Sequence, residues 1–486
     1  MSKRKSLGYK KSKNKPKRSE KSYGKQNKSR NNERKGKSQR SKNAVTAEVT
    51  CSGLTNEGKG IAEWKGKQLE VPLLLPGEKA EVNVFQKGSL VNAELKRVIT
   101  SAEERVDPPC PYYYECGGCQ LQHMSNQAQS RFKQETVDTL MKPFVKPEPI
   151  MTMDHPYDYR NKNHTTFGLN HKREVIGGLY GPHTHEIIPI DKCLIHDPKA
   201  DEIAGTLKDY MKNTKMQPYN EDTGRGFLRH VLIKVGKVSG EIMVVLVAAS
   251  SEFKGKKNFV KTLRKAHPEI TTMLLNVNKR DTSIVLGNQE DVLFGKGTIT
   301  DTLCGLKFEI SAKSFYQINP VQTEKLYGKA IEMAGLTGKE TVIDAYCGIG
   351  TIGLVASQKA RKVIGVEMNK DAVKDAIRNS KRNGVKNARF YQGDAGEFMV
   401  EMAERGDKAD VVIMDPPRSG SDEAFLSSVV KLKPKRIVYV SCNPETQVRD
   451  LKYLVKNGYE VEGIQPVDMF PQTYHVESVA KLVLKN

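Results

Sequence analysis

The chain has 486 residues, a formal net charge of +22 and a mean hydropathy of −0.56. This length accommodates two or three domains, each with a sizeable core. The longest apolar run, residues 242–249, is too short to cross a bilayer. Without a signal peptide, a soluble, cytoplasmic protein is expected, and membrane-spanning classes are excluded.

The positive charge is concentrated at the start of the chain. Residues 1–43 contain 18 Lys or Arg and two Glu, so they carry +16 of the total charge. They are rich in Ser, Asn, Gly and Lys and have no apolar periodicity, which predicts a disordered basic tail. Such a tail could aid solubility only, or it could bind the phosphates of a polyanion without specificity.

Residues 44–104 have a β-rich pattern. Alternating valines, glycine punctuation and the Pro76-Gly77 turn predict a small, five-stranded, OB-like β-barrel. A generic barrel without any nucleic-acid contact is the alternative interpretation.

The middle section, residues 105–310, is predicted to be a mixed α/β domain. Residues 157–168 (YDYRNKNHTTFG) interleave aromatic and basic side chains. That pattern suits stacking on unpaired bases, but it is equally typical of an amphipathic edge strand. Residues 226–235 and 240–250 have the pattern of further strands, and residues 130–141 have that of a helix that could pack on the C-terminal domain instead.

Four of the eight cysteines are candidates for one metal site. Cys110, Cys116 and Cys119 are spaced as C-x5-C-x2-C, and Cys193 is the plausible fourth ligand. In a chain without a signal peptide this spacing favours metal over disulfides. Four thiolates suit either zinc or an iron–sulfur cluster, and ligand chemistry leaves both open. Packing roles are expected for three other cysteines: Cys51, Cys304 and Cys347.

The last section, residues 311–486, alternates short apolar runs with helical patterns from about residue 339 onward. Alternation of this kind predicts an α/β fold with a doubly wound parallel sheet, whose ligands bind at the carboxyl ends of the strands. Gly348, Gly350 and Gly353 follow the first strand as G-x-G-x-x-G, which lets backbone approach a ligand at a helix N-terminus. Alone, this motif would suit a dinucleotide equally well, or a plain tight turn.

Two carboxylates follow the next strands in register. Glu367 closes the second strand, 19 residues after Gly348, where an acid commonly binds ribose hydroxyls. Asp394 ends the third strand, where enzymes that use S-adenosylmethionine commonly contact the adenine. A nucleoside cofactor is therefore expected.

Three further residues supply the chemistry for methylating a pyrimidine at carbon. Asp415 opens a D-P-P-R motif after the fourth strand, Cys442 ends the fifth strand, and Glu477 lies 35 residues later. Carbon 5 of uracil is a poor nucleophile, so a thiolate must first add to carbon 6, and a base must later remove the carbon-5 proton. A proline-stiffened turn at Asp415 and a buried, unreactive thiol at Cys442 are the alternative interpretations.

These motifs resemble the RNA uracil-5-methyltransferase family (the RumA/TrmA group), over roughly residues 44–486. The strand-five SCNP cysteine, the DPPR aspartate, the HVE glutamate and the segment Ser314-Phe315-Tyr316-Gln317-Ile318-Asn319 all match. The resemblance implies that Cys442 is the nucleophile, Glu477 the base and Asp415 the residue that holds the uracil ring. It also implies an S-adenosylmethionine site formed by several residues: Gln317, Tyr346, Gly348, Gly350, Glu367, Asp394 and Asp415.

The resemblance extends to both N-terminal parts. Residues 44–104 resemble the TRAM module of RNA-modification enzymes, and the cysteine spacing resembles the 4Fe-4S site of the rRNA-modifying branch of the family. Together these features imply an RNA substrate, 23S rRNA, modified at a single-stranded or loop uridine. Methyl transfer is redox-neutral, so the cluster is expected to have a structural or RNA-positioning role. No membrane and no obligate protein partner are expected.

Alternative functions remain open at this point. The same enzyme family contains tRNA methyltransferases, and a cytosine-5 methyltransferase would usually carry a second cysteine in the strand-four motif. An exocyclic-amine methyltransferase would need neither Cys442 nor Glu477. In another class, the chain could be an RNA-binding ribosome-assembly factor without catalysis, although every catalytic position is filled.

Overall fold

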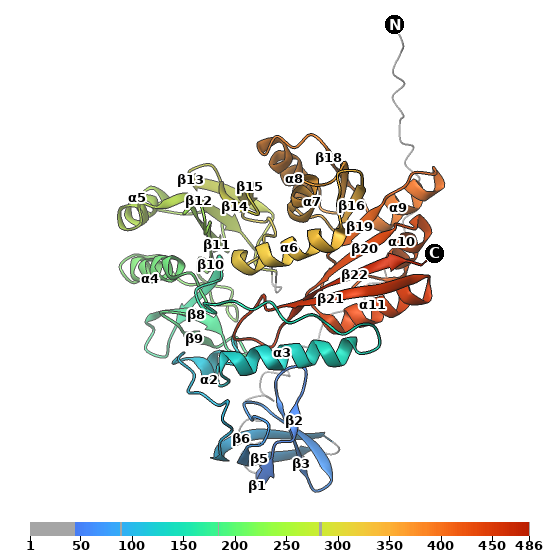
Figure 1. Ribbon diagram of the computed structural model, residues 1–486. Helices are drawn as coiled ribbons and strands as arrows, with labels where there is room; N and C mark the ends of the chain where they lie inside the picture. Colours follow the sequence, from blue (N-terminus) through green and yellow to red (C-terminus); the bar gives the residue numbers. More distant parts are fainter. Residues whose placement is uncertain (1–43, 88–89, 183, 281–283, 486) are drawn as a thin grey trace, which may run out of the picture.

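The computed structural model describes residues 44–87, 90–182, 184–280 and 284–485. Figure 1 shows the β-rich N-terminal part at one end of the molecule, and the helix α3 running between it and the C-terminal sheet. The middle sheet and the C-terminal sheet lie side by side above α3. The predicted basic tail, residues 1–43, lies outside the described residues. No described helix is both long enough and apolar enough to cross a membrane.

The described residues of the N-terminal part form six strands, where five were expected. They form two three-stranded sheets, ordered β1-β5-β6 and β2-β3-β4, and β4 packs against β6. The sheets enclose a core that includes Cys51, Leu69 and Val82. The strands are β1 (Ala44–Thr50), β2 (Gly53–Leu54), β3 (Gly60–Trp64), β4 (Lys67–Val71), β5 (Lys79–Lys87) and β6 (Leu90–Thr100). The expected β-rich unit is present, but its short hairpins give two sheets in place of one five-stranded barrel.

A buried ion pair connects this part to the next segment. Glu78 is fully buried and pairs with Arg105, whose Nε lies 2.5 Å from Oε1 of Glu78. The same carboxylate accepts hydrogen bonds from the backbone N–H groups of Leu75 and Ala102. Loss of Arg105 would leave a buried carboxylate without its cation, which costs about 3–5 kcal/mol in comparable pairs.

The helix α3 (Asn126–Met141) contains the predicted helical segment 130–141. It packs on the C-terminal part, which was one of the two expected positions. Ser125 caps its N-terminus by accepting a hydrogen bond from the N–H of Ala128. Val137 and Met141 are fully buried in a core shared with α11 (Pro444–Lys456). The short helix α2 (Tyr113–Cys116) precedes α3.

The middle part is one seven-stranded mixed sheet, ordered β13-β12-β11-β10-β7-β8-β9. Every residue of β10 and β11 is buried, consistent with two central strands. The strands are β7 (Lys162–Leu169), β8 (Val175–Tyr180), β9 (Ile187–Pro189), β10 (Leu228–Val235), β11 (Ile242–Ala248), β12 (Ile270–Val277) and β13 (Gln289–Phe294). The helices are α4 (Pro198–Lys212) and α5 (Lys256–Ala266). β7 lies between β10 and β8, which excludes the alternative of an edge strand for the part of residues 157–168 that forms β7.

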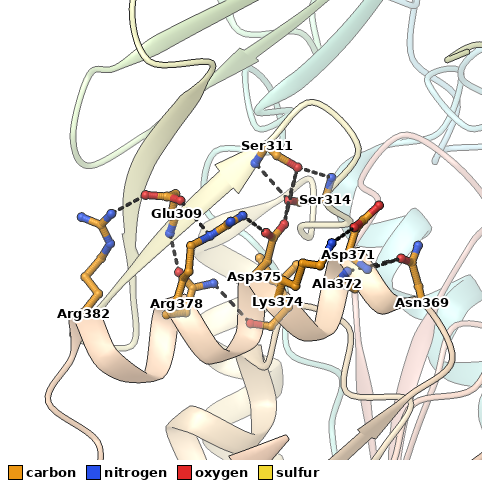
Figure 2. Close-up of polar contacts among 12 residues, drawn as sticks. Glu309, Ser311, Ser314, Asn369, Asp371, Ala372, Lys374, Asp375, Arg378 and Arg382 are labelled. Carbon is orange, nitrogen blue, oxygen red and sulfur yellow. Dashed lines mark hydrogen bonds and ion pairs between the residues drawn. The ribbon is translucent and has the colours of Figure 1, made fainter. Parts of the chain in front are cut away.

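The loop that follows strand β15 (Leu306–Ser311) is held by hydrogen bonds from both the middle part and the C-terminal part. Ser314 donates a hydrogen bond to Asp375 of α8 (Lys370–Arg382) at 2.8 Å, and Arg378 also pairs with Asp375 (Figure 2). From the other side, Nζ of the buried Lys234 donates to the carbonyls of Ser311 and Ser314. This loop therefore presents the segment 314–319 to the C-terminal sheet in one conformation. The elements around it are β14 (Thr298–Leu303), β15 (Leu306–Ser311) and α6 (Pro320–Ala334).

The C-terminal part has the predicted doubly wound α/β architecture. Its sheet is ordered β18-β17-β16-β19-β20-β22-β21, with β16 to β20 parallel and β22 antiparallel to both of its neighbours. The strands are β16 (Thr341–Ala345), β17 (Lys362–Glu367), β18 (Ala388–Gln392), β19 (Val411–Met414), β20 (Arg436–Ser441), β21 (Tyr459–Val467) and β22 (Glu477–Leu484).

Helices cover both faces of this sheet. Along β19, Val411 and Ile413 join a core with α6, α7 and α8, whereas Val412 and Met414 join a core with α9, α10 and α11. This alternation is the two-residue period of a strand buried on both faces. The remaining helices are α7 (Thr351–Ser357), α8 (Lys370–Arg382), α9 (Ala395–Glu404) and α10 (Glu423–Leu432).

Candidate active site

Three candidate catalytic residues lie at one edge of the C-terminal sheet. Asp415 directly follows β19, and Cys442 directly follows the neighbouring strand β20. β22 runs antiparallel to β20, and Ser441 pairs with Ser478. The first residue of β22, Glu477, is therefore brought to the end of β20 where Cys442 lies. The sheet topology thus collects residues that are up to 62 positions apart in sequence.

The environment of these groups favours their neutral forms. Burial, followed by the negative charge of Asp415, raises the pKa of Glu477 to about 8, and the positive charge of Arg418 opposes this shift. Burial raises the pKa of Asp415 to about 7. Burial, followed by the charges of Glu477 and Asp415, raises the pKa of Cys442 to about 11. The charges of Asp415 and Arg418 thus act on both Glu477 and Cys442.

Hydrogen bonds hold the cysteine loop against the D-P-P-R loop. Asn443 donates from Nδ2 to the carbonyl of Arg418 at 3.2 Å, and Thr446 donates from Oγ1 to the same carbonyl at 3.2 Å. Asn443 is also the N-cap of α11 and accepts from the N–H of Glu445. The motif residues after Cys442 therefore fix the relative placement of the thiol and the D-P-P-R segment.

The glycine-rich loop adjoins this edge at the end of β16. The N–H of Gly348 donates to Oε2 of Glu367 at 3.1 Å, and the N–H of Asn369 donates to Oε1 at 2.7 Å. Gly348 and Gly350 have φ of 55° and 83°, a region that suits glycine. Because β16 neighbours both β17 and β19, this loop lies at the point where strand order reverses. Such a point is the usual binding crevice of an open α/β sheet.

The other predicted cofactor residues are placed around the same loop. Tyr346 has φ of 63° and packs its ring on Phe425. Asp394 is exposed and caps α9 by accepting from the N–H of Glu397 at 3.0 Å, so its observed contact is structural. Gln317 is 8% exposed, and its backbone carbonyl accepts from Asn161.

Two further side chains at this edge were not singled out from the sequence. Asp344 is buried in β16 and accepts from the N–H of Gly353 at 2.8 Å, and burial raises its pKa to about 8. Tyr327 of α6 contacts Thr351, and burial, followed by the charge of Asp415, raises its pKa well above the usual value. An aspartate in the otherwise apolar strand TVIDA was a usable signal for Asp344, whereas a tyrosine in an amphipathic helix gives none.

The four candidate metal ligands line one cavity of about 320 Å³. Cys110, Cys116, Cys119 and Cys193 contribute to its walls together with His196. Burial raises the pKa of Cys119 to about 12. Among the residues that the structure describes, no group of three or more His, Cys, Asp or Glu side chains is arranged to hold a metal ion. The predicted quartet therefore lines one cavity, but the side chains do not form a metal site there. Of the cysteines assigned to packing, Cys51 and Cys347 are buried in cores, as expected.

The chain is similar to known RNA methyltransferases over most of its length. The model of the family described as "tRNA (Uracil-5-)-methyltransferase" matches residues 125–485. A protein of Halalkalibacterium halodurans described as an uncharacterized RNA methyltransferase is 44% identical over 448 residues, which are 90% of this chain and 97% of the relative. A similarly described protein of Caldanaerobacter subterraneus is 43% identical over 439 residues, 89% of this chain and 97% of the relative.

A solved structure shares the architecture over nearly the full length. It is the Pyrococcus abyssi tRNA (uracil-54, C5)-methyltransferase in complex with S-adenosyl-L-homocysteine. The TM-score is 0.73 at 28% sequence identity, and the alignment covers 90% of this chain and 100% of that structure.

Proposed function

Because this chain belongs to the tRNA (uracil-5-)-methyltransferase family and is an S-adenosylmethionine-dependent RNA methyltransferase, we propose that it methylates carbon 5 of a uridine in 23S rRNA. The observation that carries the chemistry is the convergence of Asp415, Cys442 and Glu477 at one sheet edge beside the glycine-rich loop. A thiol, a buried carboxylate with a pKa of about 8 and a cofactor loop are the parts that carbon-5 methylation needs.

In this proposal Cys442 begins the reaction. Its thiolate forms a bond to carbon 6 of the uracil ring, and the electrons of the 5,6 double bond move onto carbon 5 and the carbonyl at carbon 4. Asp415 holds the ring, so that carbon 6 stays beside the sulfur. Residues at the glycine-rich loop would hold S-adenosylmethionine, which would supply an electrophilic methyl group to carbon 5 and leave as S-adenosylhomocysteine.

Glu477 completes the reaction. Its carboxylate takes the proton that carbon 5 still carries, the electrons of that C–H bond restore the double bond, and the bond between carbon 6 and Sγ of Cys442 breaks. The thiolate is thereby regenerated. A base with a pKa of about 8 is well matched to this task near neutral pH, because it accepts a proton readily and is still ionised in part.

The residues at the loop fit the cofactor. Glu367 is held at the end of β17 by the N–H groups of Gly348 and Asn369, which places its carboxylate where ribose hydroxyls are bound in such sheets. The polar groups of Gln317, Asp394 and Tyr346 are proposed to complete the site.

A pH dependence follows from the electrostatics of Glu477. The base must be deprotonated, so the single-turnover rate at saturating RNA should rise with pH and show an inflection near pH 8. Removal of the nearby positive charge in Arg418→Gln should raise the pKa of Glu477 further and move the inflection to higher pH. Arg405→Gln, an exposed arginine at the end of α9, serves as the control and should leave the profile unchanged. A profile that is flat between pH 6 and 9 would contradict this assignment.

We also propose that the cysteine cavity holds a 4Fe-4S cluster. The four thiols line one cavity, and the cysteine spacing resembles that of the 4Fe-4S site in the rRNA-modifying branch of the family. Four thiolates are the usual ligands of such a cluster. The cluster would fix the segment around Cys110 to Cys119 against Cys193.

Iron analysis tests the cluster directly. Anaerobically purified protein should contain about four iron and four sulfide per chain, and Cys119→Ser should lose most of both. Cys304→Ser changes a partly buried cysteine outside the cavity and should retain them. Stoichiometric zinc without sulfide would refute the cluster.

The choice of RNA is tested by mapping the product. Features that resemble the rRNA branch, the TRAM-like region and the cysteine quartet, support 23S rRNA. The similarity to the Pyrococcus abyssi enzyme favours tRNA as the second candidate. In a strain that lacks this protein, one or more 5-methyluridines should disappear from 23S rRNA and return when the gene is restored. Loss from tRNA alone would replace rRNA with the second candidate.

A further inference from the structure

The loop between β21 and β22 leads directly into Glu477 and has an unusual set of contacts. Five consecutive backbone carbonyls, at residues 468–472, accept hydrogen bonds from other segments of the chain. The pairs are Gln322 Nε2 to Asp468 at 3.0 Å, Asn319 Nδ2 to Met469 at 3.0 Å, Lys133 Nζ to Phe470 at 3.1 Å, Tyr159 Oη to Pro471 at 3.1 Å, and the N–H groups of Gln120 and Leu121 to Gln472, both at 3.0 Å. A hairpin connection normally leaves such carbonyls to water.

The side-chain donors are buried and firmly fixed. Lys133, Asn319 and Gln322 have no exposed surface, and Tyr159 is 2% exposed. Nζ of Lys133 also lies 2.6 Å from Oδ1 of Asp468, in a buried ion pair. A buried donor that loses its acceptor costs folding free energy. Movement of the loop would break several such bonds at once, so the loop has one well-defined position.

Gln472 makes hydrogen bonds to two other segments of the chain. Its φ of 71° is in the left-handed region, which glutamine seldom adopts. Gln129 of α3 holds it there by a reciprocal pair of bonds. The N–H of Gln472 donates to Oε1 of Gln129 at 3.1 Å, and Nε2 of Gln129 donates to Oε1 of Gln472 at 2.9 Å.

The same residue is bonded to the cysteine segment. Gln120 and Leu121, whose N–H groups donate to the carbonyl of Gln472, follow Cys119 immediately. The cavity wall and the loop before Glu477 therefore share one junction. A change in the position of Cys119 must alter either these two hydrogen bonds or the loop.

We infer that Gln129 and Lys133 of α3, together with the N–H groups of Gln120 and Leu121, are positioning residues for Glu477, and that they connect the cysteine cavity to the proton-removal step. This inference rests on the proposed role of Glu477 as the base. None of these groups touches the reacting atoms. They hold the 468–472 loop, and the loop sets where β22 begins.

Accumulation of the methylated covalent complex tests this role. In Gln129→Leu the thiol can still add and the methyl can still move, but a displaced Glu477 removes the proton slowly. A displacement of about 1 Å costs on the order of 100-fold in rate. On natural uridine RNA the variant should therefore build up a slow-migrating enzyme–RNA band in denaturing gels, with kcat reduced about 10- to 100-fold and S-adenosylmethionine binding unchanged within about twofold.

The control is a glutamine on the same helix. Gln134 is half-buried and bonds to the backbone of residues 148 and 150 instead of the loop. Gln134→Leu should give no band. Gln472→Gly removes the Oε1 that accepts from Nε2 of Gln129 and gives the backbone more conformational freedom, so the loop should loosen and the variant should give the band as well.

Three results distinguish failure of the proposed base, failure of the positioning role and failure of the link to the cysteine cavity. Glu477→Gln, run on the same gel, must itself give the band; its failure would remove the proposed base and this inference with it. A band for Glu477→Gln but none for Gln129→Leu and Gln472→Gly would overturn the inference alone. The link to the cavity requires faster amide hydrogen exchange in the peptide 468–476 of Cys119→Ser than in Cys304→Ser, and equal exchange would refute that link.

Discussion

Cys442→Ala should abolish methyl transfer, with a loss of at least about 10⁴-fold in turnover, because no other group can activate carbon 5 by adding to carbon 6. The thiol lies at the end of β20 beside Glu477 and Asp415, away from the contacts that hold Glu367 at the glycine-rich loop. S-adenosylmethionine affinity should therefore stay within about twofold of wild type, measured by calorimetry, while transfer of a labelled methyl group to RNA is lost.

Cys51→Ala is the matched control for this variant. Cys51 is buried in the core of the N-terminal part, and its loss should cost stability but not remove the chemistry. Removal of the buried sulfur leaves a small cavity, which lowers the free energy of unfolding by about 1 kcal/mol or somewhat more. Appreciable turnover in Cys442→Ala, or loss of turnover that merely follows loss of folded protein, would contradict the nucleophile assignment.

Glu477→Gln should slow turnover by about 10²- to 10⁴-fold and trap the methylated covalent complex on natural uridine. The amide keeps the shape of the side chain but cannot take the carbon-5 proton, so the bond between Sγ and carbon 6 persists. The side chain is 2% exposed, and the carboxyl is already neutral to a large extent at pH 7 because its pKa is about 8. The neutral amide should therefore be tolerated by the fold.

The trapped complex is the informative observation in this experiment. It should appear as a slow band in denaturing gels and carry the labelled methyl group. Glu477→Asp should show less trapping, because a carboxylate remains. Full activity of Glu477→Gln would exclude it as the base, and loss of activity without any complex would move its role to an earlier step.

The placement of the candidate residues at one sheet edge was predictable from sequence, because Asp415 and Cys442 stand at strand ends. Asp415 and Cys442 each end an apolar run, and a parallel sheet brings such ends to one edge. Glu477 was the harder case, because it begins a strand instead of ending one. Only the reversal of β22 relative to β20 brings it to Cys442, and alternating hydrophobicity does not encode strand direction.

The features of the fold that the sequence did not predict depend on contacts between residues distant in sequence. The pattern of strands β2, β3 and β4 predicts part of a continuous barrel, but these strands form a separate sheet. Turn signals indicate where the chain reverses, and they do not indicate which sheet each strand joins. β7 was read as a possible edge strand, although pairing with β10 and β8 places it inside the sheet. The 468–472 loop gives no sequence signal at all, because its partners lie between residues 120 and 322.

The central claim, a covalent bond between Cys442 and uracil, is tested most directly with RNA that carries 5-fluorouridine at the target site. Fluorine cannot leave carbon 5 as a cation, so the reaction must stop after methyl transfer with the bond intact. Digestion and peptide mass spectrometry should find the methylated nucleotide on the peptide that contains Cys442. A nucleotide attached to another residue, or no attached nucleotide in protein that binds the RNA and S-adenosylmethionine, would contradict the account.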